Sequence, residues 1–479
     1  MPELRPAQTV GFRRILWFLL PLLLVLAIGL AAAHLLSPAP SPETPPSADL
    51  VRPTSPRPLG TLRGTVTDGT MNSLLVQDEA GQTHSFDRMD APVVGNSQGI
   101  LIGSLVSVTY FGDLADAQPE QALFVAVEAP PPEEAQEEHP PTLRELAQAY
   151  LDTMTLEEKV GQMFFARRPK EDAPQDAADY ALGGYLLFTR DIQDRTPEEV
   201  AQEVADCQQA ASIPLFIGVD EEGGSVVRIS KFPAFRDEPF PSPQELWQQG
   251  GLPAVQADTA EKCALLHSLG VNVNFAPVCD VSQNPEDYIY SRTLGLDGES
   301  TAQYVRTVVE EMTAQGMGSV LKHFPGYGGS QDTHSAIARD DRPYEAFVQS
   351  DFLPFQAGIE AGASMVLVSH NIVSSMDSQL PASLSPKVHT ILREELGFQG
   401  VIITDDLDMA GAKDFAGTEQ SAVLAVQAGN DLLCVTDYQV QIPAVLQAVE
   451  EGVISPQRID ESVLRILELK LALGILPRE

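Results

Sequence analysis

The chain has 479 residues, more than the ~100 to 200 residues of one domain, which excludes a single small binding module. Its 30 Lys and Arg residues stand against 67 Asp and Glu residues, and the formal charge of −37 is the opposite of what binding to nucleic-acid phosphates requires. A hydrophobic content of 43% excludes a globally disordered chain, so we expect several folded units and no nucleic-acid partner.

An uncharged apolar segment lies close to the N-terminus, at residues 15–36. As a helix, its 22 residues would extend ~33 Å, which is enough to cross the hydrocarbon core of a bilayer. Three arginines stand in residues 1–14, whereas the next cation after the segment is Arg52. The positive-inside rule therefore predicts a cytoplasmic stretch at 1–14, a single-pass transmembrane signal-anchor at 15–36 and an extracytoplasmic remainder. The alternative is a cleaved signal peptide, which the alanines at 31–33 would suit and which would make the protein secreted.

Two Pro-rich linkers frame a small region of predicted strands. Residues 37–58 are rich in Pro and Ser, which favours an extended spacer, and residues 130–141 form a second, acidic linker. Between them, at 59–129, five short runs alternate apolar and polar residues and are separated by turn residues. This pattern predicts a small, all-β, barrel-like domain. Because it has few Lys and Arg residues and no evident aromatic surface, we expect a spacer or a wall-binding module rather than an oligonucleotide binder.

The remaining residues, 142–479, behave as one large domain. Eight apolar runs recur along it, with helical patterns between them. Buried strands separated by helices are typical of a parallel sheet covered on both faces, and eight of them predict an α/β fold of the closed (β/α)8, TIM-type barrel class. Helix-start signals agree, since Thr155 and Glu158 have the spacing of a capping box and Ser455 precedes Pro456. The runs are GQMFFA (161–166), GGYLLF (183–188), PLFIGVD (214–220), VNVNFAPV (271–278), GSVLKHF (318–324), SMVLVSH (364–370), GVIITDD (400–406) and DLLCV (431–435).

Ionisable residues stand at the ends of five of these runs. Because the chemistry of such barrels lies at the carboxyl ends of the strands, residues from different runs should meet there. A single Asp after a parallel strand is often only the N-cap of the next helix, but five such ends together favour a catalytic or binding site. From the third run to the seventh, these residues are Asp220, Cys279 with Asp280, Lys322 with His323, His370, and Asp405 with Asp406.

A Gly-rich segment, FPGYGGSQDTHS, follows the fifth run and contains Asp332 and His334. In an extended segment these two side chains would lie on the same side. A carboxylate beside an imidazole can orient the ring and raise its pKa, which suits a proton donor near neutral pH. Gly326, Gly328 and Gly329 would let the segment move as a lid, and the alternative is a surface loop with an incidental ion pair.

Five segments of the large domain form a specific series: GGYLLFTRDI, VDEEGGSVVR, FAPVCDV, KHFPGYG with DTH, and ILREELGFQGVIITDDLDMAGA. Together they resemble glycoside hydrolase family 3, and in particular its β-N-acetylglucosaminidase branch. The resemblance covers roughly residues 145–440 in unbroken order and does not extend to residues 1–140. Two positions depart from the family pattern, since Tyr327 stands where His is usual and Ser225 where Arg is common.

The resemblance implies a role for each motif residue. The Asp after Gly-Val-Ile-Ile-Thr is the family's nucleophile, which is Asp405 here, and the adjacent Asp406 would support it. The family's Asp-x-His pair corresponds to Asp332 and His334, so His334 is the expected general acid/base and Asp332 the group that orients it. The expected sugar-binding residues are Asp220, Arg228, Arg292, Lys322 and His323.

These residue types suit a retaining glycosidase. Such an enzyme needs a carboxylate below the anomeric carbon, to form a glycosyl-enzyme, and a proton donor for the leaving oxygen. The Asp-x-His loop favours the hexosaminidase branch, as does the short chain after Asp405, which has no room for the second α/β domain of the family's β-glucosidases. We therefore expect a membrane-anchored exo-β-N-acetylhexosaminidase that removes terminal, non-reducing N-acetylglucosamine from cell-wall glycans such as peptidoglycan fragments, without a cofactor.

Three alternatives compete with this expectation. An imidazole donor adds no negative charge to the site, so phosphate could attack the intermediate and make the protein a β-N-acetylglucosaminide phosphorylase. A membrane-tethered barrel that binds glycans without cutting them would have a damaged nucleophile or acid/base, and neither is seen. A metal site, with His323, His334, His370 and Asp405 as ligands, fails because HxH is missing after the first strand. The four cysteines have no CxxC or zinc-like spacing, and we expect core thiols.

Overall fold

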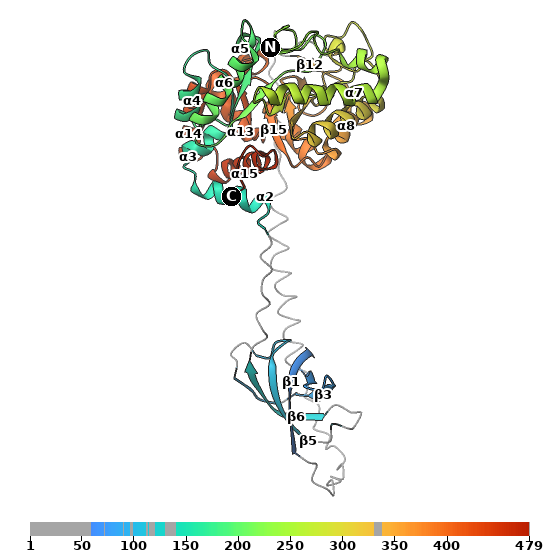
Figure 1. The fold of residues 1–479 in the computed structure, drawn as a ribbon, viewed down its shortest axis with the longest axis vertical. Helices are drawn as coiled ribbons and strands as arrows, with labels where there is room; N and C mark the ends of the chain where they lie inside the picture. The colour runs from blue at the N-terminus through green and yellow to red at the C-terminus, as the bar shows by residue number, and fades with distance from the viewer. Residues whose placement is uncertain are drawn as a thin grey trace, which may run out of the picture. The chain divides into compact units, whose positions relative to one another are not determined.

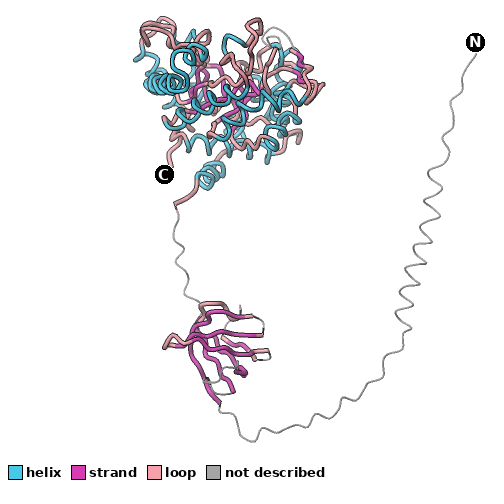
Figure 2. Tube along the Cα trace, turned by 90° about the vertical axis from the view of Figure 1, so that its right-hand side faces the viewer, coloured by secondary structure: helices cyan, strands magenta, loops and turns pink. Residues whose placement is uncertain are grey.

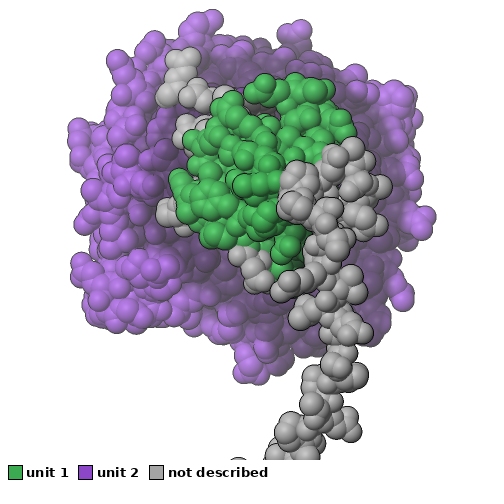
Figure 3. All heavy atoms as spheres, turned by 90° about the horizontal axis from the view of Figure 1, so that it is seen from below, with its two compact units in different colours: residues 1–138 green, residues 139–479 purple. Residues whose placement is uncertain are grey.

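The computed structural model describes residues 59–70, 72–89, 91–95, 99–111, 114, 120–129, 140–329 and 338–478 (Figure 1). Contacts divide the chain into two compact units, Met1–Glu138 and His139–Glu479, which Figure 3 colours separately. Within the described ranges, no helix has both the length and the apolar character needed to cross a membrane. The anchor predicted at 15–36 lies outside these ranges, as does the linker predicted at 37–58.

The first unit contains a small all-β sheet. Its main strands follow one another in the order β3-β2-β1-β5-β6, and β3 also pairs with β6, so the path closes into a barrel-like ring. Side chains alternate along each strand between the interior and the outside, and β5, for example, buries Val106, Val108 and Tyr110. The short β4 joins β6 in parallel and adds a strand to the five that the sequence predicts. The bounds are β1 (Leu59–Gly69), β2 (Ser73–Asp78), β3 (Thr83–Asp87), β4 (Val93–Val94), β5 (Leu105–Phe111) and β6 (Glu120–Ala129).

The second unit is built on a nearly closed barrel of eight parallel strands. From β7 to β15 the strands follow one another around the barrel in chain order, and β16 lies beside β7. Between β15 and β16 the pairing is reduced to one parallel bridge, Ile403 with Leu432. The strands are β7 (Phe164–Arg167), β8 (Gly184–Leu187), β9 (Phe216–Val219), β10 (Val273–Asn274), β11 (Gly318–Phe324), β13 (Met365–Val368), β15 (Val401–Thr404) and β16 (Leu433–Val435). Each overlaps one of the eight predicted runs, so the predicted α/β barrel is confirmed.

Helices surround these strands, as the tube in Figure 2 shows. Side-chain caps define where several of them begin, and Thr155 forms the predicted capping box with Glu158 while Ser455 caps the last helix. The α-helices are α2 (Leu143–Thr153), α3 (Leu156–Gln162), α4 (Ala173–Asp179), α5 (Thr189–Ile192), α6 (Pro197–Ala210), α7 (Pro243–Ser268), α8 (Gly298–Ala314), α9 (Tyr344–Ala346), α10 (Phe352–Glu360), α11 (Pro386–Thr390), α12 (Ala410–Ala416), α13 (Thr418–Ala428), α14 (Tyr438–Glu450) and α15 (Pro456–Ala472). The smaller elements are the 3-10 turns η1 (Tyr290–Arg292) and η3 (Ala382–Leu384), the π-helical turns η2 (Phe347–Asp351) and η4 (Ile391–Glu395), and the paired strands β12 (Arg339–Asp340) and β14 (Ile372–Val373).

Aromatic side chains fill the barrel where two strand glycines make room for them. Phe165 from β7 is fully buried and stacks on Phe275, with ring centroids 5.4 Å apart. A Cβ at Gly184 would lie 2.1 Å from the Phe165 ring and one at Gly218 would lie 2.7 Å from it, so a larger residue at either position would displace the ring. The four cysteines are free and buried, which confirms the prediction of core thiols.

Candidate active site

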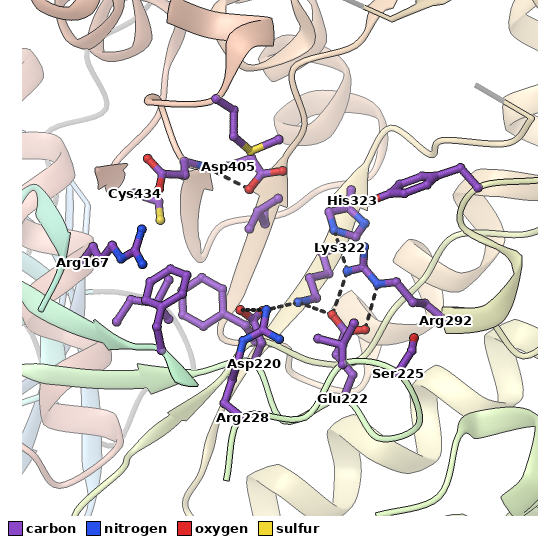
Figure 4. A pocket seen from close by; sticks show the side chains of 18 of the residues that line it. Arg167, Asp220, Glu222, Ser225, Arg228, Arg292, Lys322, His323, Asp405 and Cys434 are labelled. Atoms are coloured by element: carbon purple, nitrogen blue, oxygen red, sulfur yellow. Dashed lines mark hydrogen bonds and ion pairs between the residues drawn. The ribbon is translucent and has the colours of Figure 1, made fainter. Parts of the chain in front are cut away.

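A cavity of about 490 Å³ opens at the carboxyl ends of the barrel strands (Figure 4). This is the edge at which (β/α)8 barrels carry their chemistry. Its walls come from strands β7, β8, β11, β13 and β16 and from segments that follow strands, including those after β9 and β15. The lining residues are Arg167, Leu186, Phe188, Asp220, Glu222, Ser225, Val226, Arg228, Phe275, Tyr288, Ser291, Arg292, Lys322, His323, Leu367, Asp405, Asp406, Met409 and Cys434.

One wall of the cavity holds a series of buried ion pairs that starts at Lys322 on β11. The Lys322 Nζ lies 2.7 Å from Asp220 Oδ1 and 2.6 Å from Glu222 Oε1. Glu222 also accepts two hydrogen bonds from Arg292, at 3.0 Å from Nε and 2.7 Å from Nη2. The same Nη2 lies 3.2 Å from His323 Nε2. Three segments that are far apart in the sequence, those after β9 and β10 and the end of β11, are thereby joined into one charged surface, as the dashed lines in Figure 4 show.

The two carboxylates of this wall are held ionised by the cations that they contact. Burial by itself would raise the pKa of Asp220, but Lys322 and Arg228 outweigh burial and keep this pKa below its ordinary value. Burial acts in the same direction on Glu222, where Arg292 and Lys322 together lower the pKa further. Ionised carboxylates accept hydrogen bonds from hydroxyl groups, and the fixed ammonium and guanidinium groups beside them donate hydrogen bonds to hydroxyl oxygens. This wall is therefore suited to binding a polyhydroxylated ligand.

A buried carboxylate fixes the ring of His323 from behind. Asp280 is fully buried and lies 2.7 Å from His323 Nδ1. It also accepts hydrogen bonds from the backbone N–H groups of His323 and Tyr327, at 3.1 and 2.8 Å. These contacts select the tautomer in which Nδ1–H donates to Asp280 and Nε2 accepts from Arg292. The imidazole is thereby held in one orientation at the cavity wall.

Adjacent glutamates after β9 have different parts in the fold. Glu221 is completely buried, and its carboxylate accepts hydrogen bonds from the backbone N–H groups of residues 228–230 at 2.8 to 3.2 Å. The chain turns back between them through Gly223 and Gly224, whose φ values of 104° and 62° are readily adopted only by glycine. Glu221 thus shapes the loop, whereas Glu222 faces the cavity.

The opposite wall carries two adjacent carboxylates that form no ion pair with any described residue. Asp405 follows β15, and its Oδ1 accepts a hydrogen bond from the backbone N–H of Asp406 at 2.9 Å. Asp406 accepts from the backbone N–H of Asp408 at 3.0 Å and from the Thr436 hydroxyl at 3.2 Å. Burial, with a smaller contribution from the charge of Asp405, raises the pKa of Asp406 to about 6.

The cavity brings together most of the residues that the sequence predicts for the site. Asp332 and His334 lie in the segment 330–337, outside the described residues. His370, which the sequence places at a strand end, is completely buried and lies 2.9 Å from the carbonyl oxygen of Asp406 through Nε2, so it supports the backbone of the cavity wall. The predicted site residues that line the cavity are Asp220, Arg228, Arg292, Lys322, His323 and Asp405.

Sequence reasoning missed three residues of this site. Glu222 joins Lys322 to Arg292, and its sequence signals were its place two residues after the strand-end Asp220 and inside the segment VDEEGGSVVR. Asp280 was predicted to lie at a strand end, but its hydrogen bond to His323 was not predicted. Arg167 carried no signal, since the periodicity of a strand does not say which of two adjacent arginines enters the cavity. Among the residues that the structure describes, no group of three or more His, Cys, Asp and Glu side chains is arranged to hold a metal ion.

Comparisons with known proteins give a consistent family. The family described as "Glycosyl hydrolase family 3 N terminal domain" matches residues 155–469. A "Beta-hexosaminidase" of Xanthomonas campestris pv. campestris (strain B100) is 33% identical over 272 residues, which cover 56% of this chain and 81% of that protein. A "Beta-hexosaminidase A" of Pseudoalteromonas piscicida is 31% identical over 324 residues, which are 61% of this chain and 54% of the relative, so the chain matches about half of that protein.

A solved structure agrees with these sequence matches. It is the glycoside hydrolase family 3 beta-N-acetylglucosaminidase from Paenibacillus sp. str. FPU-7, which superposes with a TM-score of 0.63 at 32% identity. The superposition covers 67% of this chain and 63% of that one. The resemblance drawn from the sequence motifs is thereby confirmed.

Proposed function

Since the chain belongs to glycosyl hydrolase family 3, we propose that it is a retaining exo-β-N-acetylhexosaminidase that hydrolyses terminal, non-reducing N-acetylglucosamine from glycans. The observation that carries this proposal is the asymmetry of the cavity. Asp405 stands without a cation among the described residues, opposite a wall of paired charges that suits sugar hydroxyls. Beta-hexosaminidases among the relatives support the N-acetylated sugar as the substrate class.

The wall around Lys322 binds the terminal sugar. Lys322 and Asp220, 2.7 Å apart, can serve one hydroxyl as donor and acceptor, and His323 and Arg292 offer further polar atoms beside them. Because the charges are already paired and buried, they do not need to reorganise when the sugar arrives. In this proposal the anomeric carbon of the bound sugar faces the opposite wall, where the nucleophile lies.

Asp405 acts as the nucleophile. Its Oδ1 is oriented by the Asp406 backbone N–H, and no described cation competes with the substrate for the carboxylate. Attack on the anomeric carbon forms the glycosyl-enzyme bond as the bond to the leaving oxygen breaks, and water then displaces Asp405 from the same carbon. Two inversions at one carbon give a product with the configuration of the substrate.

His334 donates the proton to the leaving oxygen and then removes one from the attacking water, with Asp332 as its orienting partner. These roles rest on the Asp-x-His motif. The described residues on both sides of the segment are fixed: Arg342 Nε lies 2.9 Å from Asp340 Oδ2, and Arg342 Nη2 lies 3.5 Å from the carbonyl oxygen of Gly326. Both flanking stretches are thereby tied to one side chain.

Leaving-group dependence tests the part of His334. In His334→Ala we expect the rate of glycosyl-enzyme formation to fall about 10² to 10⁴-fold for an aryl glycoside with a poor leaving group. The loss should be much smaller for 2,4-dinitrophenyl β-N-acetylglucosaminide, because a good leaving group needs little protonation. Pre-steady-state rates measured with both substrates give the two values, and equal losses would count against His334 as the acid.

The location of the protein is a further part of the proposal. The uncharged segment 15–36 anchors it in the cell membrane, and the cations in residues 1–14 keep the N-terminus in the cytoplasm, so that the cavity meets cell-wall glycans outside. Fractionation should find the full-length chain in the membrane, with residues 142–479 accessible to protease added to whole spheroplasts. Recovery of a soluble chain that starts after residue 33 would instead indicate a cleaved signal peptide.

Product analysis tests the activity itself. The purified full-length protein is given 4-nitrophenyl β-N-acetylglucosaminide with and without inorganic phosphate, and the released sugar is identified by mass spectrometry. Free N-acetylglucosamine under both conditions is the expected result. Sugar 1-phosphate formed when phosphate is present would make the protein a phosphorylase, and no release under either condition would favour a glycan-binding protein.

A further inference from the structure

Tyr288 places an aromatic ring where the cavity meets solvent. It lies between β10 and η1 and lines the cavity together with His323 and Lys322. Tyr288 is 41% exposed, whereas His323 and Lys322 are 6% and 2% exposed. Among the described residues, it is the one large apolar side chain of this cavity that is so exposed. The ring of Tyr288 therefore belongs to the mouth of the cavity rather than to its enclosed part.

Two further rings connect Tyr288 with the buried wall of the cavity. The ring of Tyr327 lies 6.4 Å from that of Tyr288, at an interplanar angle of 71°, and 5.0 Å from that of His323, at 70°. Both are edge-to-face contacts, which aromatic rings favour. Tyr327 is 2% exposed, and its backbone N–H donates to Asp280, the carboxylate that also holds His323. Tyr288 is thereby supported from the buried wall before a ligand binds, which lowers the cost of binding one.

Tyr327 is also one of the two positions at which the sequence departs from the family pattern, where His is usual. A phenol ring is larger than an imidazole, and here it fills the space between His323 and Tyr288. The proposed mechanism gives Tyr327 no part in the reaction. The support of Tyr288 therefore comes from the residue that departs from the pattern and not from the shared motif.

The position of Tyr288 relates it to the part of the glycan beyond the terminal sugar. In the proposed function the terminal sugar occupies the enclosed part of the cavity, between the wall of Lys322 and that of Asp405. An exo-acting enzyme encloses only the end of a glycan, so the rest of the chain passes through the mouth. The ring of Tyr288 lies at this mouth, where the sugar on the leaving side of the scissile bond would be.

The chemistry of this rim suits a pyranose. The C–H groups on one face of a pyranose form an apolar surface, and contact with an aromatic ring removes this surface from water. Ser291 in η1 also lines the cavity and offers a hydroxyl group that can donate and accept hydrogen bonds. A flat apolar surface with a polar group nearby is a typical composition of a ligand site. This kind of recognition does not require a charge on the ligand.

We propose that Tyr288 stacks on the sugar at the leaving side of the scissile bond, and that the enzyme consequently favours glycans with a pyranose leaving group over glycosides of an acyclic alcohol. The feature that is recognised is the apolar face of the leaving sugar. This inference rests on the proposed hydrolase function and adds to it a residue that selects the leaving group.

Two neutral substrates with the same terminal sugar test the stacking. N,N′-diacetylchitobiose has a pyranose as its leaving group, whereas 2-methoxyethyl β-N-acetylglucosaminide has a flexible acyclic alcohol. The measured quantity is the ratio of kcat/KM for the disaccharide to kcat/KM for the methoxyethyl glycoside, from chromatography of the released N-acetylglucosamine. In the full-length Tyr288→Ala enzyme we expect this ratio to fall by about tenfold or more, the effect of losing an apolar contact with one of two substrates.

Conservative variants and a control assign the effect to the ring. Tyr288→Phe and Tyr288→Trp should keep the ratio close to that of wild type, because both retain an aromatic surface. Phe111→Ala is the matched control, since Phe111 is also aromatic and is 40% exposed, but belongs to the first compact unit and does not line the cavity. The ratio in Phe111→Ala should equal that of wild type.

Two outcomes would overturn the inference. Equal losses on both substrates in Tyr288→Ala would leave the ratio unchanged and would assign Tyr288 to the terminal sugar or to the structure of the wall. A ratio in Tyr288→Phe as low as that in Tyr288→Ala would assign the recognition to the hydroxyl group instead of the ring.

Calorimetric binding to Asp405→Asn separates this test from the hydrolase proposal. Asp405→Asn should bind the disaccharide more tightly than the methoxyethyl glycoside, and adding Tyr288→Ala should remove the difference. This result would support the stacking even if the protein hydrolysed neither substrate. Equal affinities of Asp405→Asn for the two ligands would contradict it whether or not the wild-type protein is a hydrolase.

Discussion

On the cavity wall formed after β9 and β11, Asp220 and Glu222 each contact cations, whereas Asp405 and Asp406 on the β15 wall contact none among the described residues. Both walls are largely buried, so the difference is not one of solvent exposure. A carboxylate that is held by a lysine or an arginine can accept hydrogen bonds from a sugar but is a poor nucleophile. The ionised form of Asp406 is disfavoured by burial, as its raised pKa shows, and no described cation occupies the carboxylate of Asp405. In the proposed mechanism, the distribution of ion pairs thus separates a wall that binds the sugar from a wall that reacts with it.

Removing the unpaired charge of Asp405 should have the largest effect on activity. In Asp405→Asn we expect kcat to fall by about 10⁴-fold or more, because the amide cannot form the glycosyl-enzyme. Its amide oxygen can still accept the hydrogen bond from the Asp406 backbone N–H, and no ion pair with a described residue is lost, so the thermal midpoint should stay within a few degrees of wild type. Steady-state rates and calorimetry on the same preparation check both statements. If Asp405→Asn loses activity only because it unfolds, the carboxylates of the two walls do not differ in their contribution to stability, which would contradict the comparison.

Removing the paired charge of Lys322 should act mainly on stability. Lys322→Met leaves Asp220 and Glu222 buried with fewer cations, and we expect the free energy of unfolding to fall by about 3 to 5 kcal/mol. Denaturant unfolding measures this loss. The matched control is Lys159→Met, which breaks the more exposed pair with Asp460 and should cost less than about 1 kcal/mol. Similar losses in the two variants would mean that burial does not distinguish the cavity wall from a surface pair.

The smallest expected effect concerns the pH dependence of stability. Because the pKa of Asp406 is raised to about 6, the folded protein binds this proton more tightly than the unfolded chain does. The associated stability is fully present below about pH 4 and is lost as the pH rises to about 6, where the folded carboxyl ionises. Relative to wild type, Asp406→Asn should therefore gain about 1 to 2 kcal/mol between these pH values and keep it at pH 7. Urea unfolding at pH 4, 5, 6 and 7 gives the difference, and a constant offset would show that Asp406 titrates normally.

The barrel could be predicted from the sequence because each of its strands and helices has a signal within a short stretch of the chain. Each strand interior is a continuous apolar run, and a capping residue such as Thr155 marks where a helix begins. The approximate meeting of Asp220, Lys322 and Asp405 then follows from the geometry of parallel strands, whose carboxyl ends share one edge. Roles such as nucleophile came only from the family resemblance, since many barrels carry an Asp at a strand end.

The contacts of individual side chains in the site could not be predicted, because they depend on which residues the fold brings together. Glu221 and Glu222 are chemically identical and adjacent, and only the turn through Gly223 and Gly224 decides that one binds backbone N–H groups and the other faces Lys322. His370 was predicted at the strand-end site and is found behind it, holding the Asp406 carbonyl group. These outcomes depend on contacts between residues far apart in the chain.

Covalent trapping tests the central claim, that Asp405 attacks the anomeric carbon. A 5-fluoro-N-acetylglucosaminyl fluoride forms the intermediate readily and releases it slowly, because the ring fluorine disfavours the positive charge that develops in the transition state. Intact-mass measurement of the full-length protein, followed by peptide mapping, locates the label. We predict one sugar per chain, attached to Asp405, and no label in Asp405→Asn. A label on Asp406 or on a residue outside the β15 wall would contradict the assignment.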